Sequence, residues 1–151
     1  MSSGTPIIRA RTVQAIAPQS ASTTITGTGI PTAGFNWAKV CLLVGAIVSG
    51  GTLDVTVEES DTLGGSYAAI TGAVFAQRTN ALQNLPLVGE IDLRGRKAFI
   101  RVVCAAATQA CLFAVDVEMS EADRSERTYG AQLTSSPPAT PLTATAAAFS
   151  V

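Results

Sequence analysis

The chain has 151 residues, a formal net charge of −1 and no histidine. This length suits one domain whose core is large enough to fold without disulfides. The lack of histidine excludes Ser–His and Cys–His nucleophile pairs and histidine metal sites. The near-neutral charge argues against a nucleic-acid-binding protein, which would carry a basic stripe. Charged residues make up only 14%, against about 25% in an ordinary soluble domain, so part of the surface consists of small residues or is buried against a partner.

Location and redox state follow from short features of the sequence. The longest apolar run, residues 40–48, is shorter than the ~20 residues that a membrane helix needs. The first six residues lack the basic and apolar blocks of a secretory signal, so we expect a cytoplasmic site of synthesis and no membrane contact. Cys41, Cys104 and Cys111 lie among apolar neighbours, which predicts free, buried thiols. No CxxC pair is present, so neither a metal nor another cofactor is expected.

The first half of the chain predicts strands in order. An N-terminal strand is expected over residues 7–16. Residues 39–48 are apolar on both faces, as in a central strand that is covered on both sides. Ser49-Gly50-Gly51 then favours a hairpin turn into residues 53–58, which alternate apolar and polar side chains. A weaker strand is expected over residues 73–78.

The second half continues the same period of two. Residues 90–93 lead through the turn Arg94-Gly95-Arg96 into residues 98–104, and residues 111–119 form a last strong strand. Seven or eight short strands predict an all-β, antiparallel β-sandwich that resembles a jelly roll, with a closed barrel as the structural alternative. The residues expected to be buried in it are Leu53, Val55, Val57, Ile91, Ile100, Val102, Phe113, Val115 and Val117.

The two ends differ in composition from the middle. Residues 1–38 are expected to form an N-terminal strand and a Ser/Thr/Gly-rich arm or loop, and residues 39–120 the sandwich core. Residues 121–151 are expected to form an extended C-terminal arm, because no charge follows Arg127. One interpretation is an untethered extension. The other is an arm that orders only across a neighbouring subunit, with Leu133, Leu142 and Phe149 as apolar contacts.

No group of residues is specific enough to predict catalysis. Glu58 and Glu59 are neighbours on a strand and should point to opposite faces. The acids between Asp116 and Asp123 lack the glycine turn of a calcium loop. The segment 63–66 has neither the lysine nor the helix of a phosphate-binding loop. We therefore expect a protein that is not an enzyme and has no catalytic residues.

The basic residues Arg94, Arg96, Lys97 and Arg101 are the one positive concentration in the sequence. They are interpreted either as a solvated sheet edge that discourages pairing with other sheets or as a patch that meets acidic groups on a protein partner. Nucleic-acid binding is not expected, because Glu90 and Asp92 lie close by in the sequence and weaken the local positive field.

Four segments resemble a pattern of tailed-bacteriophage virion proteins. They are GTLDVTVEESD at residues 51–61, the pair GSY and ITGA at residues 65–67 and 70–73, and GRKAFIRV at residues 95–102. The resemblance covers about residues 40–118. It implies a small β-sandwich head protein, of the kind that decorates or cements the outside of a capsid, and it brings no catalytic residues. The arms lie outside the matching region.

Together these observations predict a structural protein of a phage virion that binds the exterior of the shell and stabilises it. Its expected partners are the major capsid protein and further copies of itself, as a dimer or trimer. The resemblance implies that it is made in the host bacterial cytoplasm and is located on the capsid surface. Two alternatives stay open: a structural protein of the phage tail or neck, and a virion-displayed module that binds a carbohydrate or receptor.

Overall fold

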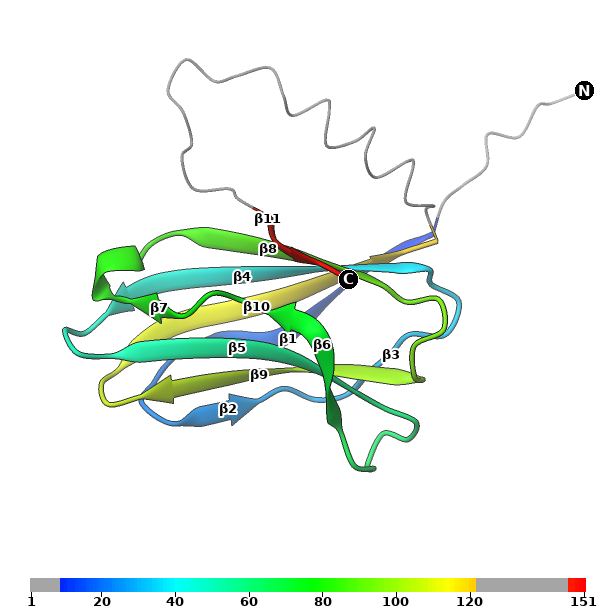
Figure 1. Ribbon diagram of the computed structural model, residues 1–151, viewed down its shortest axis with the longest axis horizontal. Helices are drawn as coiled ribbons and strands as arrows, with labels where there is room; N and C mark the ends of the chain where they lie inside the picture. Colours follow the sequence, from blue (N-terminus) through cyan, green and yellow to red (C-terminus); the bar gives the residue numbers. More distant parts are fainter. Residues whose placement is uncertain (1–8, 122–146) are drawn as a thin grey trace, which may run out of the picture.

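The computed structural model describes residues 9–121 and 147–151, and most of them belong to two packed β-sheets (Figure 1). A single turn of 3-10 helix, η1 (Asn80–Leu82), precedes β8. The strands in chain order are β1 (Ala10–Ala21), β2 (Thr24–Thr26), β3 (Ile30–Pro31), β4 (Trp37–Ile47), β5 (Thr52–Ser60), β6 (Ala68–Val74), β7 (Arg78–Thr79), β8 (Pro86–Asp92), β9 (Phe99–Ala107), β10 (Cys111–Ser120) and β11 (Ala147–Ser150).

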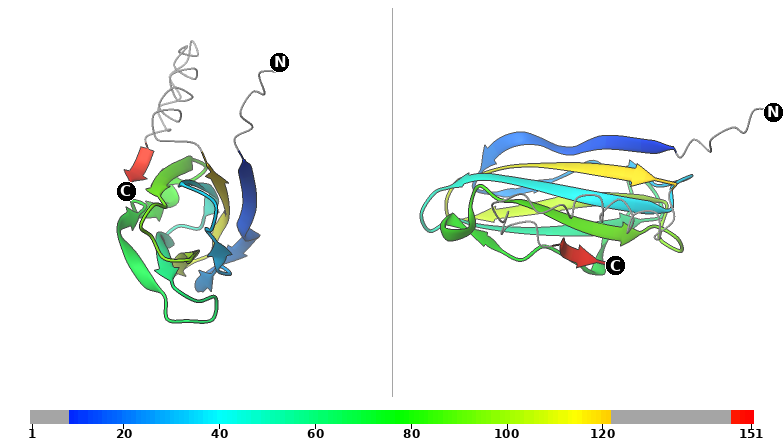
Figure 2. Two further views of the ribbon diagram at one scale, coloured as in Figure 1. Left: turned by 90° about the vertical axis from the view of Figure 1, so that its right-hand side faces the viewer. Right: turned by 90° about the horizontal axis from the view of Figure 1, so that it is seen from above.

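The strands form two sheets with an apolar interior between them. Sheet A has the order β1-β10-β4-β8-β11, and sheet B has the order β2-β9-β5-β6, with β3 also pairing with β9 and β7 with β5. All of these pairings are antiparallel except that of β11 with β8, which is parallel. Seen end-on, the sheets curve around a common interior (Figure 2). The predicted antiparallel β-sandwich is confirmed.

Most connections cross from one sheet to the other. The turn at residues 48–51 joins β4 of sheet A to β5 of sheet B, so the predicted hairpin at Ser49-Gly50-Gly51 is wrong. The turn around Gly95 likewise joins β8 of sheet A to β9 of sheet B. Gly50 and Gly95 have φ values of 86° and 78°, a region that glycine enters without steric cost. Such crossings let consecutive amphipathic strands face each other across the core.

The apolar faces of the strands meet between the sheets. All nine residues predicted to be buried are at most 2% exposed, which confirms the period-two assignment of these faces. Cys104 and Cys111 are also buried in this core, and none of the three cysteines forms a disulfide, as expected. Cys41 is only half-buried, so its predicted burial is wrong.

The N-terminal region is part of the sandwich, which differs from a core that begins at residue 39. β1 is an edge strand that pairs with β10, and β2 and β3 pair with β9. Ile16 and Ile30 are buried in the common core. A Cβ atom on Gly27 would lie 2.8 Å from the backbone oxygen of Ala15, so the glycine here lets the first strands approach closely. The Ser/Thr/Gly-rich composition thus reflects short strands and tight crossings.

The strand predicted over residues 73–78 is displaced. β6 ends at Val74, and β7 begins only at Arg78. Between them Phe75 is buried, and its amide donates to the carbonyl oxygen of Val55 at 3.0 Å. Gly72, with φ at 84°, breaks the regular alternation in this region, which explains the weak signal in the sequence.

The last residues of the chain close one side of the sandwich. β11 lies along β8 and also contacts β6 of the other sheet (Figures 1 and 2). Phe149 is 8% exposed, with its ring 4.8 Å from that of Phe75 in an edge-to-face arrangement. The expectation that Phe149 orders only against a neighbouring subunit is therefore wrong, because its own chain supplies an apolar site. Leu133 and Leu142 lie outside the described residues.

Candidate interaction surfaces

Three of the predicted basic residues form ion pairs at one end of the sandwich, where β5 ends and β9 begins. Arg101 pairs with Glu58 at 2.6 Å. The Arg96 guanidinium lies 3.8 Å from the Glu59 carboxylate, which also accepts the backbone amide of Lys97 at 3.2 Å. The Lys97 ammonium lies 3.1 Å from Asp61. Each cation therefore has an acid from the β5 end of sheet B, and we call this group the ion-pair cluster.

Arg101 makes the shortest ion pair of the ion-pair cluster. Its Nε and Nη2 atoms both donate to Oε2 of Glu58, at 2.7 and 2.6 Å. Its guanidinium also lies 4.0 Å from the centre of the Tyr67 ring, a cation–π contact. Tyr67 in turn donates its hydroxyl to the carbonyl oxygen of Leu63 at 3.0 Å. A side chain at Gly29 would overlap with the Tyr67 hydroxyl, so the glycine leaves room for the ring.

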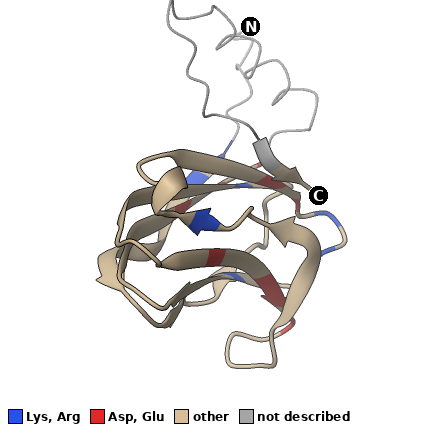
Figure 3. Ribbon diagram, turned by 60° about the vertical axis from the view of Figure 1, so that its left-hand side comes forward, with Lys and Arg blue, Asp and Glu red and all other residues tan. Residues whose placement is uncertain are grey.

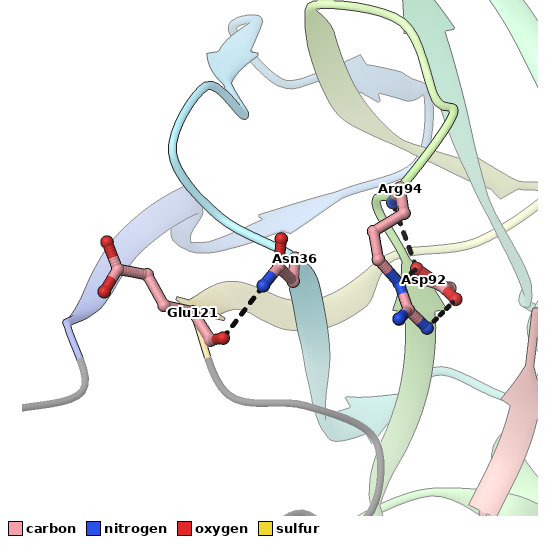
Figure 4. A network of polar contacts seen from close by, with 4 residues as sticks. All are labelled: Asn36, Asp92, Arg94 and Glu121. Carbon is pink, nitrogen blue, oxygen red and sulfur yellow. Dashed lines mark hydrogen bonds and ion pairs between the residues drawn. The ribbon is translucent and has the colours of Figure 1, made fainter. Parts of the chain in front are cut away.

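Arg94 is paired within its own turn. Its side chain donates to both carboxylate oxygens of Asp92, at 2.9 and 2.7 Å (Figure 4). In the same region Asn36 donates from Nδ2 to the carbonyl oxygen of Glu121 at 2.9 Å, which fixes the end of β10 (Figure 4). Acidic and basic positions are few and interspersed over the described strands (Figure 3). The basic residues are thus neutralised locally by acids, and the interpretation as a free positive patch loses its electrostatic basis.

A second surface lies on the outer face of sheet A and is apolar at one end. Leu43 of β4 is 47% exposed and Leu112 of β10 is 43% exposed. Gly45 lies beside Leu112. A Cβ atom added at Gly45 would lie only 2.8 Å from the Leu112 side chain. The absence of that Cβ helps to leave a groove of about 300 Å³, which we call the apolar groove. Its lining residues are Pro18, Leu43, Val44, Gly45, Leu112, Phe113 and Ala114.

The other end of the same face is charged. Lys39 of β4 lies between Glu118 of β10 and Glu90 of β8 in the strand register. Asp116 follows on β10, opposite Cys41. The outer face of sheet A therefore divides into an apolar half and a charged half along its strands.

Sequence reasoning missed the apolar groove because it expected residues 39–48 to be covered on both faces. Leu43 is about half exposed. The face of β4 that points away from the core is therefore apolar at this position but lies at the surface. The signal was present in Leu43 and Leu112, which are apolar at positions that face away from the core. Their nearness required the register of β4 and β10, in which Leu43 lies opposite Ala114, and that register is not readable from either strand alone.

The titratable groups of the described residues form no metal site, and the buried thiols are not activated. No group of three or more His, Cys, Asp or Glu residues among them could hold a metal ion. Burial raises the pKa of Cys104 to about 12 and also raises that of Cys111, so neither thiol is activated as a nucleophile. Burial lowers the pKa of Arg78, whose Nε atom has no hydrogen-bond partner among the described residues. Residues 9–121 and 147–151 contain no helix with the length and apolar character that spanning a membrane requires.

Comparison with solved structures shows a similar fold in a protein of prophage origin. The crystal structure of SPBc2 prophage-derived protein YomS superposes with a TM-score of 0.52, at 13% sequence identity, over 79% of this chain and 99% of that chain. The infectious bursal disease virus VP2 subviral particle gives a TM-score of 0.48, at 14% identity, over 76% of this chain and 33% of that chain. No protein-family model and no curated protein sequence matches this chain.

Proposed function

We propose that this protein is a non-enzymatic structural protein of a phage virion, which binds the exterior of the capsid and stabilises the shell. The observation that carries the proposal is the apolar groove on the outer face of sheet A, where Leu43 and Leu112 are exposed side by side with small residues. An exposed apolar patch with a polar border is typical of a protein interaction site. Its occupant in this proposal is the major capsid protein.

The fold and composition support the same reading. A sandwich similar to that of a prophage-derived protein suits a virion component, although fold alone does not determine function. The low fraction of charged residues, 14%, suits a protein whose surface is repeatedly covered by others. Many weak contacts of one groove, repeated over a shell, would add through multivalency without any single strong site.

The test is co-sedimentation with shells of the encoding virion that lack this protein. Leu43→Glu and Leu112→Glu place a charge in the apolar groove, where it would be desolvated on docking, so we expect each to weaken binding at least tenfold. Leu63→Glu is the matched control, because Leu63 is 55% exposed in the β5–β6 connection of sheet B. It should saturate shells at the parental concentration. Parental binding by both groove variants would remove the groove from the proposal.

A second measurement tests the stabilising role. Decorated and bare shells are heated or stretched osmotically, and release of the genome is followed. We expect bare shells to open at a lower temperature. Equal resistance would overturn the cement role, and labelling of the protein in intact particles by electron microscopy would then distinguish a tail or neck location from a displayed module. Binding to a glycan array would favour the latter.

A further inference from the structure

One short strand, β11, occupies the edge of sheet A at β8. Gly89 lies in β8 directly beneath Phe149. A Cβ atom added to this glycine would overlap with the Phe149 ring, because its three nearest neighbours would all be atoms of that ring. The ring fills the space between β8 and Phe75, at the side where the two sheets would otherwise be open. A glycine in the interior of a strand marks such a close approach. We call Gly89, Phe75 and the edge of β8 the strand acceptor.

Backbone contacts fix the register of the bound strand. The amide of Val151 donates to the carbonyl oxygen of Glu90 at 2.9 Å, and the amide of Asp92 donates to the carbonyl oxygen of Val151. Ala147 lies opposite Val88, and Phe149 opposite Gly89. The acceptor thus recognises an extended peptide by main-chain hydrogen bonds and by one aromatic side chain, which is the chemistry of β-strand addition.

The tether to this strand is much longer than its path requires. The chain leaves sheet A at Glu121, beside Ser120, and β11 lies three strand positions away in the order β10-β4-β8-β11. At about 4.8 Å per strand and about 3.3 Å per residue along β8, Glu121 and Ala147 are on the order of 20 Å apart. The segment between them, residues 122–146, can reach up to about 80 Å when fully extended.

Withdrawal of β11 would leave the edge of β8 unpaired. Such an edge is a template for a strand from another chain. Exchange of an identical element between copies preserves every contact and is a low-cost route to assembly.

We propose that the strand acceptor takes residues Ala147–Val151 of a second copy of this chain. Phe149 of one copy then lies over Gly89 of the next, and neighbouring copies on a shell become linked through their C-terminal strands. In an isolated chain the same strand occupies its own acceptor, as the structure has it. The proposal does not depend on capsid binding and is tested on the free protein.

The experiment uses two complementary full-length variants. Phe149→Ala removes the aromatic anchor and leaves the acceptor intact, whereas Gly89→Val blocks the acceptor and leaves the donor strand intact. Isotope-labelled Phe149→Ala chain is titrated with unlabelled Gly89→Val chain and followed by amide chemical shifts. The control titrant carries both substitutions and so lacks a donor. Far-ultraviolet circular dichroism checks folding, and a synthetic peptide of residues 145–151 replaces the Gly89→Val chain if that variant does not fold.

We expect saturable shifts at the amides of Glu90 and Asp92 with the Gly89→Val chain or the peptide, and none with the control. No shift up to about 1 mM, the effective concentration typical of a short tether, would overturn the acceptor site. Exchange in otherwise parental chains is then tested by mixing chains that carry Glu90→Cys with chains that carry Ser150→Cys, since these positions lie opposite each other. A disulfide-linked dimer that neither chain forms alone is the expected result. Its absence under oxidising conditions would overturn the exchange.

Discussion

Arg101 of β9 and Glu58 of β5 lie directly opposite each other on the outer face of sheet B, joined by two hydrogen bonds to one carboxylate oxygen at 2.7 and 2.6 Å. Both side chains are largely covered, at 28% and 21% exposure. Cross-strand charge pairs of this kind stabilise a sheet modestly and favour one register. Arg101, which the sequence analysis interpreted as part of a possible basic patch, thus helps to hold β5 and β9 together.

The first prediction concerns the strength of this pair. A double-mutant cycle with Glu58→Gln and Arg101→Met should give a coupling free energy of about 0.5–1 kcal/mol, which shrinks in 1 M salt. The more exposed pair of Lys97 and Asp61 is the control. Its coupling free energy should be less than half of that for Arg101 and Glu58. Urea unfolding of the four chains in each cycle measures the coupling. Equal coupling for the two pairs would contradict a special role for Arg101.

The second prediction tests the assigned faces of β9. Val102 is fully buried, and Val103 points to the outer face of sheet B. Val102→Asp places an unpaired charge in the core and should cost about 3–5 kcal/mol of unfolding free energy. Val103→Asp should cost less than about 1.5 kcal/mol. Thermal unfolding of both variants distinguishes the two faces, and similar melting temperatures would mean that the faces are wrongly assigned.

The sequence predicted the fold where alternation was strong. Leu53, Val55 and Val57 repeat every second residue, and a half-buried strand is the simplest structure that places them on one face. Which strands pair was not predictable, because the register of β5 with β9 joins residues that are about 40 to 55 positions apart. Consecutive strands therefore looked like hairpin partners, although β4 and β5 belong to different sheets.

The candidate surfaces were less predictable for the same reason. The basic residues were visible in the sequence, but their acids lie on β5 and in the loop that follows it, so their neutralisation depends on tertiary structure. Phe149 was identified as an apolar contact, yet the position of its binding site depends on Gly89 in β8. A glycine in the interior of a strand was the signal that could have indicated this site.

The third prediction concerns alkaline pH. Burial raises the pKa of Cys104 from 9.0 to about 12. The Cys104 thiol therefore stays protonated in the folded protein at pH values where it loses its proton in the unfolded chain. Stability from this group is complete below pH 9 and is lost as the pH rises from 9 toward 12, with a loss on the order of 2 kcal/mol by pH 11. Urea unfolding of the parent and of Cys104→Ala should show a stability gap that narrows over this range. A constant gap would refute the linkage.

The fourth prediction concerns Arg78, which is 8% exposed and whose Nε atom lacks a partner among the described residues. An unsatisfied buried polar group costs free energy that an apolar side chain of similar shape does not. Arg78→Met should therefore unfold at the same or a higher temperature than the parent. A loss of more than about 1 kcal/mol would show that the guanidinium makes a stabilising interaction.

The fifth prediction separates the bound C-terminal strand from the rest of the sandwich. Phe149 and Phe75 are in edge-to-face contact, but Phe75 lies in the chain between β6 and β7, deep in the core, whereas Phe149 belongs to a four-residue edge strand. Phe149→Ala should release β11 alone, because the remaining core residues keep their contacts. Amide exchange should then accelerate at Asp92 and Val151, whose hydrogen bonds join β8 to the C-terminus, while Val102 stays protected. Phe75→Ala removes a ring from the interior and should lower the global unfolding free energy by about 3–5 kcal/mol. If Phe149→Ala instead destabilised the whole molecule as much as Phe75→Ala does, β11 would be an integral strand that cannot leave its acceptor without unfolding the protein.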